Sequence, residues 1–321
     1  MLRTFLTEDW NLRFPLVGAP MAGVAFGALA RAVSEAGGLG CIGIGSEDPV
    51  ERIAQEAAVA GADGVRFGIG LMAWALERRP ELFDAALAAR PFLLSISFGD
   101  VAPYADRVRR AGIKLVTQVQ SREAAVTAER AGVDAIVVQG TEAGGHTSGV
   151  ATLPLLQIVL DAVTTPVIAA GGVATARGLA AVLAAGAEGA WIGTPLLASP
   201  EAHNTPQARA AVIRAREDET VLTSLFDRVQ NIPWPAQFPG RALANEFTRR
   251  YHGREDEAVA DEAALAAYRA ARTANDFSLA HLYAGQSVGA LERERSAAEV
   301  ISSIGEGAEV LLRERLAALA A

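Results

Sequence analysis

Eight short apolar segments recur between Pro15 and about residue 197, separated by longer alanine-rich stretches of helical period. This alternation is typical of a parallel sheet whose strands are joined by helices. The expected strands are Leu16–Ala19, Leu39–Ile42, Arg66–Ile69, Phe92–Ile96, Lys114–Gln118, Ala135–Gln139, Val167–Ala170 and Gly189–Ile192. A regular repeat that reaches eight predicts an α/β fold, the (β/α)₈ or TIM barrel. A doubly wound open sheet is the alternative, but it normally uses fewer strands.

Helical candidates lie between these strands, and five of the intervening stretches end in Ala-Gly, a pair that suits a helix C-cap. The expected helices are Phe26–Glu35, Pro49–Ala60, Glu81–Ala88, Tyr104–Ala111, Arg122–Ala131, Leu153–Ala162 and Ala176–Ala185. The Ala-Gly pairs fall at residues 36–37, 60–61, 111–112, 131–132 and 185–186.

The repeat stops after Pro195, and the chain then carries several prolines and a polar helical stretch, Asp261–Asn275, without a comparable strand signal. We therefore expect three parts: a barrel at residues 1–198, a helical insertion or lid at 199–284, and a C-terminal segment at 285–321. In the last part, Glu299–Ala320 is rich in alanine and leucine with charges on one face, which predicts a helix that packs back on the barrel.

Composition narrows the functional classes. With 29 basic and 37 acidic residues the net charge is −8, and no basic run exceeds a pair, so nucleic-acid binding is not expected. A single cysteine, Cys41, excludes an intramolecular disulfide and Cys-rich zinc sites, which favours a reducing cytoplasm. No apolar stretch has the form of a signal peptide or membrane span. A homo-oligomer is compatible with the sequence.

In a barrel, catalytic groups lie just after the C-terminal ends of the strands. The first unusual cluster there is residues 19–23, Ala-Pro-Met-Ala-Gly. Its proline and glycine let the backbone pass close to a flat ligand, which the Met21 amide or sulfur would face. An ordinary turn that begins a helix is the alternative interpretation.

The second cluster, residues 139–149, follows the sixth strand and surrounds His146 with glycines. Such a loop buries little apolar area and has a high backbone entropy, so a function is favoured over packing. Among the four histidines, only His146 is expected on the catalytic face. We expect His203, His252 and His281 to be surface or structural residues, with His281 beside Tyr283 able to line a lid.

Glycine-rich turns also follow the seventh and eighth strands, at residues 170–173 and 191–194. Loops at these two positions often bind phosphate, because backbone N–H groups and helix N-termini attract an anion. No P-loop or strand-linked G-x-G-x-x-G is present. The only lysine, Lys114, should point to the barrel bottom, which argues against a Schiff-base aldolase. Cys41 ends the second strand and does not follow the sixth, so a thioimidate-forming nucleotide dehydrogenase lacks its expected nucleophile. No spacing of His, Cys or carboxylates suits a metal site.

Taken together, these segments resemble the nitronate monooxygenase family, formerly called 2-nitropropane dioxygenases, which are FMN-dependent (β/α)₈ enzymes. The resemblance covers most of the chain in the right order. It is carried by residues 19–23, 35–40, 139–146, 167–172, 192–194 and 283–286.

The resemblance implies that Pro20 and Met21 lie against the isoalloxazine and that His146 faces the substrate as catalytic base or proton donor. Gln139 and Gly144 would touch the flavin, and Gly172 with Gly193 and Thr194 would bind the FMN phosphate. The full expected cofactor-binding set is Ala19, Pro20, Met21, Gln118, Gln139, Gly144, Gly145, Gly171, Gly172, Trp191, Ile192, Gly193 and Thr194.

The chain departs from the family pattern at two positions. Gly70 stands where an Asn often follows the third strand, and Trp191 stands where a Gln commonly precedes the Gly-Thr of the eighth. The implied function is oxidation of alkyl nitronates by O₂ to a carbonyl compound and nitrite. The alternatives are an FMN-dependent NAD(P)H reductase for enoyl thioesters or quinones, and a non-catalytic flavin- or phosphate-binding barrel.

Overall fold

The structure, a computed structural model, describes residues 2–320 and shows the predicted (β/α)₈ barrel. Eight parallel strands close in chain order, and their ends differ from the sequence prediction by no more than three residues. The barrel strands are β1 (Leu16–Gly18), β2 (Leu39–Gly43), β3 (Gly68–Met72), β4 (Leu93–Ser97), β5 (Lys114–Val119), β6 (Ala135–Gln139), β8 (Val167–Ala170) and β9 (Gly189–Ile192).

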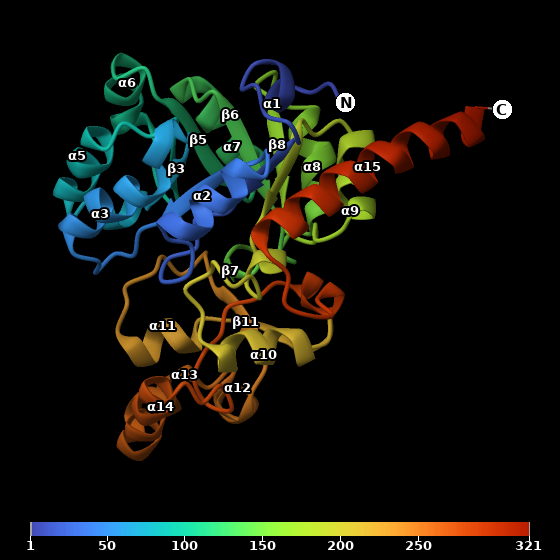
Figure 1. Cartoon of the computed structure of the whole chain (residues 1–321). Helices are drawn as coiled ribbons and strands as arrows, with labels where there is room; N and C mark the ends of the chain where they lie inside the picture. The colour runs from blue at the N-terminus through green and yellow to red at the C-terminus, as the bar shows by residue number, and fades with distance from the viewer. Residues whose placement is uncertain (1, 321) are drawn as a thin grey trace.

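Helices form a ring around the strands, and the long α15 lies against α9 and α2 to complete it (Figure 1). The ring consists of α2 (Gly27–Glu35), α3 (Val50–Ala60), α4 (Ala73–Leu76), α5 (Pro80–Ala88), α6 (Ala102–Arg110), α7 (Arg122–Ala131), α8 (Thr152–Leu160), α9 (Ala176–Ala184) and α15 (Ala297–Ala320), with a 3₁₀ turn, η1 (Ala62–Gly64). Of the Ala-Gly pairs, all but the one at Gly61 place their glycine at positive φ just after a helix.

Alternate residues of each strand enter two separate cores, as the two-residue period of a strand requires. Leu16 and Ile42 face the helices, whereas Val17 and Cys41 face the barrel interior. Helix α1 (Phe5–Glu8) and the residues after it close the N-terminal end of the barrel, where Trp10 is buried among apolar side chains. The opposite end of the barrel is left for a site.

The segment after β9 is not purely helical, which corrects the sequence prediction. Strands β10 (Thr220–Thr223) and β11 (Gly240–Leu243) form an antiparallel sheet with β7 (Gly145–His146), in the order β10-β11-β7. These strands are two to four residues long and pair over long sequence separations, so no local alternation announces them. The remaining elements are η2 (Thr194–Leu196), α10 (Pro206–Arg214), α11 (Leu225–Gln230), α12 (Glu246–Tyr251), α13 (Glu255–Ala260), α14 (Glu262–Ala274) and η3 (Gln286–Ala290).

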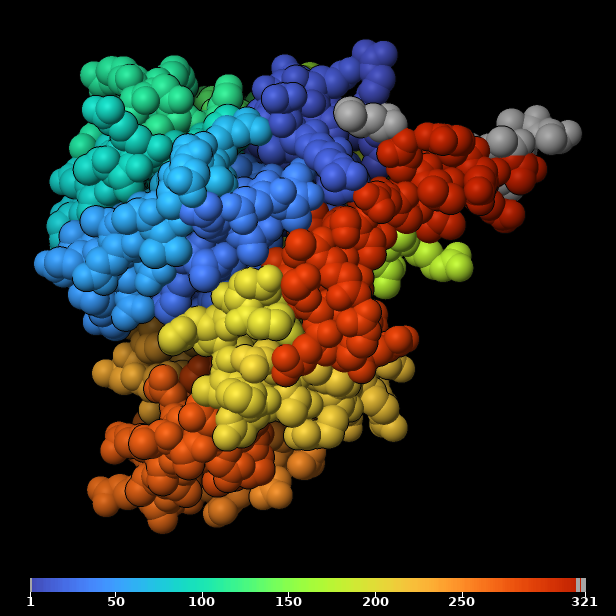
Figure 2. Space-filling view, viewed as in Figure 1, coloured from blue at the N-terminus to red at the C-terminus, as the bar shows by residue number. Residues whose placement is uncertain are grey.

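The insertion between β9 and α15 lies at one end of the barrel and α1 lies at the other (Figure 1). In the space-filling view, the yellow and orange residues of the insertion pack against the end of the barrel opposite α1 (Figure 2). Arg241 of β11 ties the two parts together, because its guanidinium donates to the Thr141 carbonyl at 2.6 Å and to the Thr141 hydroxyl at 3.2 Å. No helix within residues 2–320 is long and apolar enough to cross a membrane.

Candidate active site

A cavity of about 500 Å³ lies where the C-terminal strand ends meet the insertion. It is lined by the loops after most barrel strands and by residues of the insertion. His146 and twelve of the thirteen residues expected at the cofactor line this cavity; Ile192 does not. Its side chain packs in the core between strands and helices, because Trp191 beside it takes the inward position.

Pro20 and Met21 occupy the space above two glycines on neighbouring strands. A Cβ built on Gly70 would lie 2.3 Å from Pro20 Cβ, and one built on Gly43 would lie 2.4 Å from the Met21 carbonyl carbon. Real Cβ atoms do not come this close to other atoms, so an Asn cannot stand at position 70 while Pro20 stays in place. Gly70 therefore sets the path of the loop at the cavity floor.

The turn after β8 is shaped to hold an anion. Gly171 and Gly172 have φ values of +96° and +74°, which L side chains rarely adopt. Within residues 2–320, the Gly172 N–H donates to no protein acceptor. The N-terminus of α9 follows directly, capped by Thr175, whose Oγ1 accepts from Gly178 N at 3.2 Å. These donors and the helix dipole favour a phosphate here.

Thr194 stands across this turn with its hydroxyl oxygen accepting from the Gly285 N–H at 2.9 Å. Its hydroxyl proton remains free to donate to a ligand. The loop after β6 is held equally closely, since a Cβ on Gly144 would lie 2.6 Å from Gly285 N. Segments on both sides of the insertion thus fix the cavity wall.

Two buried side chains present hydrogen-bond donors without protein acceptors. The Trp191 indole is only 3% exposed, and its Nε1–H has no partner. The Gln139 amide oxygen accepts from Gln120 Nε2 at 2.7 Å, which leaves the Gln139 Nε2–H₂ group for another acceptor. An unpaired buried donor costs free energy, so a bound ligand with acceptor atoms fits this wall.

His146 forms a buried cluster with residues of the insertion. Its Nε2 lies 3.0 Å from both carboxylate oxygens of Asp227, and the two side chains are 9% and 6% exposed. The Trp234 ring stacks on the imidazole with centroids 3.4 Å apart and an angle of 8° between the planes. The Tyr283 hydroxyl donates to Asp227 Oδ1 at 3.4 Å. The arrangement joins a proton-carrying group to a carboxylate in an apolar wall.

His281 also lines the cavity, as the sequence had allowed, and its Nδ1 lies 2.6 Å from the Tyr268 hydroxyl. Burial, with the positive charge of Arg272, lowers the pKa of His281 to about 3, so the ring is neutral at physiological pH. Burial also raises the pKa of Tyr283 and Tyr268 well above the usual range, so both stay protonated. Asp227 is the carboxylate that faces His146.

His203 is exposed, as the sequence predicted, but it also lines the cavity, with its ring 5.0 Å from that of Phe26. His252 is half-exposed beside Glu255, as expected.

Lys114 does not line the cavity and pairs with Asp134 at 2.9 Å. Cys41 is buried in the barrel, which raises the pKa of its thiol. Among the described residues, no group of three metal-ligating side chains converges.

Sequence reasoning missed Asp227, Trp234 and Phe98. Asp227 had a usable signal, because α11 places it among the apolar Leu225, Phe226 and Val229, and a carboxylate on a buried helix face needs a partner. Phe98 has φ +64°, a strained value for an aromatic residue, and its ring meets those of Trp234 and Phe238.

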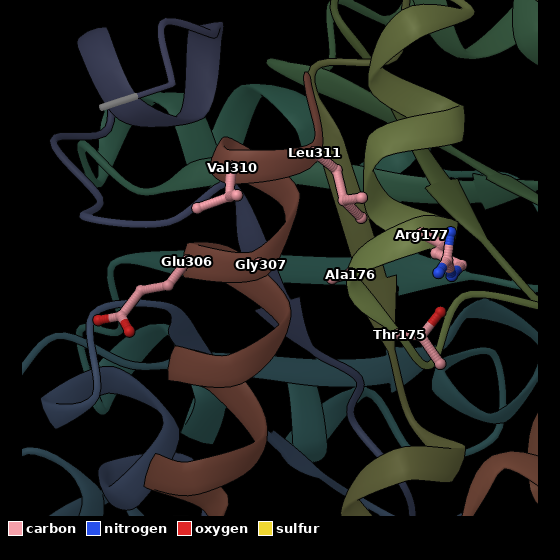
Figure 3. Close-up of a pocket in the computed structure, with 7 residues that line it drawn as sticks. All are labelled: Thr175, Ala176, Arg177, Glu306, Gly307, Val310 and Leu311. Atoms are coloured by element: carbon pink, nitrogen blue, oxygen red, sulfur yellow. The ribbon is translucent and has the colours of Figure 1, made fainter. Parts of the chain in front are cut away.

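A second hollow lies between α9 and α15 and is lined mainly by apolar surface of those helices (Figure 3). Its two charged side chains, Arg177 and Glu306, stand on opposite sides of it. No set of polar groups converges there, so it does not compete as a reaction site.

The closed (β/α)₈ barrel, with a cavity at its C-terminal strand ends and a histidine–carboxylate pair in the wall, defines an enzyme scaffold. The family model described as nitronate monooxygenase matches residues 81–307. The chain belongs to the nitronate monooxygenase family and is a flavin-dependent oxidoreductase of that family.

Three similar proteins each cover most of this chain. A probable nitronate monooxygenase of Staphylococcus aureus is 29% identical, with 88% of this chain and 91% of the relative covered. The nitroalkane oxidase of Streptomyces ansochromogenes is 31% identical, with a TM-score of 0.79 and coverage of 96% and 98%. FabK of Thermotoga maritima is 27% identical, with a TM-score of 0.86 and coverage of 99% and 100%.

Proposed function

We propose that the protein binds FMN and oxidises alkyl nitronates, or nitroalkanes that it first deprotonates, with O₂ to a carbonyl compound and nitrite. The observation that carries this proposal is the His146–Asp227 pair in the wall of a cavity that also contains an anion-binding turn. A reaction that begins by removing a proton next to a nitro group needs a base in this position.

The residues present fit FMN. Its phosphate would lie at Gly172, Thr194 and the N-terminus of α9, and its ring would lie over Pro20 and Met21. The unpaired Trp191 Nε1–H and the Gln139 amide would donate to ring acceptors. Trp191 thereby supplies a donor where the family commonly has Gln. When bound, FMN accepts electrons from the substrate and passes them to oxygen.

The chain's own residues divide the remaining work. Gly70 and Gly43 admit the backbone of residues 20–21 close to the strand ends and so set the floor. His146 receives or returns the substrate proton, and Trp234 with Phe98 forms an apolar wall that excludes water from this side. A reducing cytoplasm suits the free, buried Cys41.

The second candidate is an FMN-dependent NAD(P)H reductase acting on an enoyl thioester or a quinone. The course of the backbone supports this candidate. The enoyl reductase FabK has a TM-score of 0.86 to this chain, which exceeds the 0.79 of nitroalkane oxidase. A non-catalytic flavin-binding barrel is the third possibility, and steady turnover of any substrate excludes it.

Purification followed by an absorbance spectrum, identification of the released flavin and a nitrite assay tests the proposal. We expect a yellow protein that releases FMN on denaturation and forms nitrite from an alkyl nitronate in air. Anaerobic mixing separates the candidates: bleaching by nitronate alone supports the monooxygenase, and prompt bleaching by NADH or NADPH supports the reductase. Release of FAD, or of no flavin, contradicts the cofactor assignment.

A further inference from the structure

Asp227 contacts His146 through one ring nitrogen only. Both carboxylate oxygens lie 3.0 Å from Nε2, and within residues 2–320 the Nδ1 atom of His146 has no hydrogen-bond partner. A carboxylate beside one nitrogen of a neutral imidazole accepts the proton of that nitrogen. His146 therefore carries its proton on Nε2 and keeps a lone pair on Nδ1.

The ring is held in place by two different contacts. Trp234 stacks in parallel on the imidazole at 3.4 Å and fixes the plane of the ring. Asp227 then determines which nitrogen points away from the carboxylate. A base that is already oriented pays a smaller entropic cost to reach the productive geometry when the substrate binds.

Asp227 is the charged group that contacts His146. The titratable groups that face it are Asp227, Tyr283 and His281, with Tyr268 and Arg272 behind them. Tyr283 stays protonated and His281 stays neutral, because burial shifts the pKa of each away from neutrality. Among the described residues, no lysine or arginine lines the cavity. Asp227 is thus the group that stabilises an imidazolium when His146 gains a proton.

We propose that Asp227 is the positioning residue of the reaction, and that it holds His146 in the Nε2–H tautomer so that Nδ1 deprotonates a neutral nitroalkane. The carbon–hydrogen bond next to the nitro group breaks, a bond from Nδ1 to that proton forms, and the electron pair moves into the carbon–nitrogen bond of the resulting nitronate. The substrate class is the neutral nitroalkane, and this inference rests on the proposed function.

The kinetic test compares Asp227→Asn with wild type on a neutral nitroalkane and on its preformed nitronate. An Asn side chain presents an N–H₂ group to Nε2 and favours the wrong tautomer. We expect kcat/KM to fall about 10²–10³-fold for the nitroalkane, within the usual range of acid–base catalysis, and much less for the nitronate. Asp256→Asn is the matched control: this exposed carboxylate of α13 is paired with Arg228 of α11, and its loss should leave both rates unchanged.

A double-mutant cycle shows whether Asp227 acts through His146. In the His146→Asn background, Asp227→Asn should cause no further loss, because the residue that it positions is absent. A loss of the wild-type size in that background, or an equal loss on both substrates, overturns the proposal. Circular dichroism and flavin content verify that each variant is folded, and Asp227→Glu, which keeps the charge, should recover part of the nitroalkane rate.

The ¹⁵N spectrum of histidine-labelled protein reads the tautomer without any substrate. The His146 signals, assigned by their loss in His146→Asn, should show a protonated Nε2 and an unprotonated Nδ1 in wild type, and a changed ratio in Asp227→Asn. A protonated Nδ1 in wild type overturns the assignment. Absence of nitrite from wild type defeats the proposed function instead, and the tautomer measurement then still decides the role of Asp227.

Discussion

The two sides of the cavity are built from different materials. The barrel side is rich in glycines and includes Pro20 and Met21, so it presents mainly backbone and small groups to a ligand, with Gln139 and Trp191 as side-chain donors. The insertion side supplies Asp227, Trp234, His281 and Tyr283, which carry charge, protons and aromatic surface. The barrel thus determines what can be held, and the insertion supplies the groups around His146 that determine what can be done to a substrate. Mutations on the two sides should have separable effects, on flavin binding and on turnover respectively.

The largest expected effect separates turnover from binding. His146→Asn should lower kcat/KM for a neutral nitroalkane by about 10²–10⁴-fold, because the proton acceptor is lost, while flavin content stays at the wild-type level. A preformed nitronate should suffer less. Nitrite formation with each substrate measures this, and His252→Asn, on the exposed surface of the insertion, is the control. Equal losses on both substrates would show that His146 orients the anion rather than removing a proton.

Gly172→Val should have the opposite effect: it should weaken flavin binding. A Cβ at position 172 would lie 3.7 Å from Glu142 Cβ, and φ +74° is unfavourable for valine, so the turn changes and the N–H moves away from the phosphate. Loss of one charge-assisted hydrogen bond predicts roughly 10–100-fold weaker FMN binding. Titration of the apoprotein with FMN checks this. Gly112→Val is the control. Gly112 also has a positive φ, +71°, and a Cβ added there would have no neighbour within 4 Å, but the residue lies outside the cavity.

His281 links the insertion side to acid stability. Because its pKa is about 3 in the folded chain and near 6.5 when unfolded, the unfolded state binds more protons between these values. Its contribution is present above pH 6.5 and is lost as the pH falls, by about 2 kcal/mol between pH 6.5 and 5. His281→Gln should remove this part of the pH dependence. Urea unfolding of both proteins at pH 7 and pH 5 measures it, and identical pH slopes would contradict the buried neutral histidine.

The smallest effect concerns the indole donor on the barrel side. Trp191→Phe keeps an aromatic ring but removes the unpaired Nε1–H, which should weaken FMN binding about 2–10-fold, the value of one ordinary hydrogen bond. Trp191→Gln, the residue common in the family, should bind FMN more tightly than the Phe variant. Trp10→Phe removes a similar unpaired indole at the other end of the barrel and should leave binding unchanged. Equal FMN affinities for wild type and Trp191→Phe would show that the indole has no part in the site.

The same contrast explains what the sequence could predict. The eight strands and their helices appear in the sequence because their signals are local: apolar period, Ala-Gly endings and glycine turns. The barrel side of the cavity follows from them, apart from Ile192, whose backbone position was right but whose side chain points outward. That His146 faces the cavity could also be predicted, because it lies in the loop at the end of a barrel strand.

The insertion side could not be predicted in this way. Asp227 lies 81 residues beyond His146, and their contact depends on β11 pairing with β7. No local pattern specifies such a pairing when the strands are two and four residues long. That the exposed His203 also lines the cavity was missed for the same reason, since its approach to the cavity depends on the chain returning beside Phe26 after β9.

The pairing of Gly240 with His146 and of Arg241 with Gly145 has a consequence for protein engineering. Exchanging residues 199–284 between relatives looks like a simple loop graft, because both ends of this segment leave the barrel at one rim. The graft would nevertheless cut a sheet whose third strand stays behind in the recipient. A workable chimera must carry residues 145 and 146 with the transplanted segment, so the unit of exchange is discontinuous in the chain.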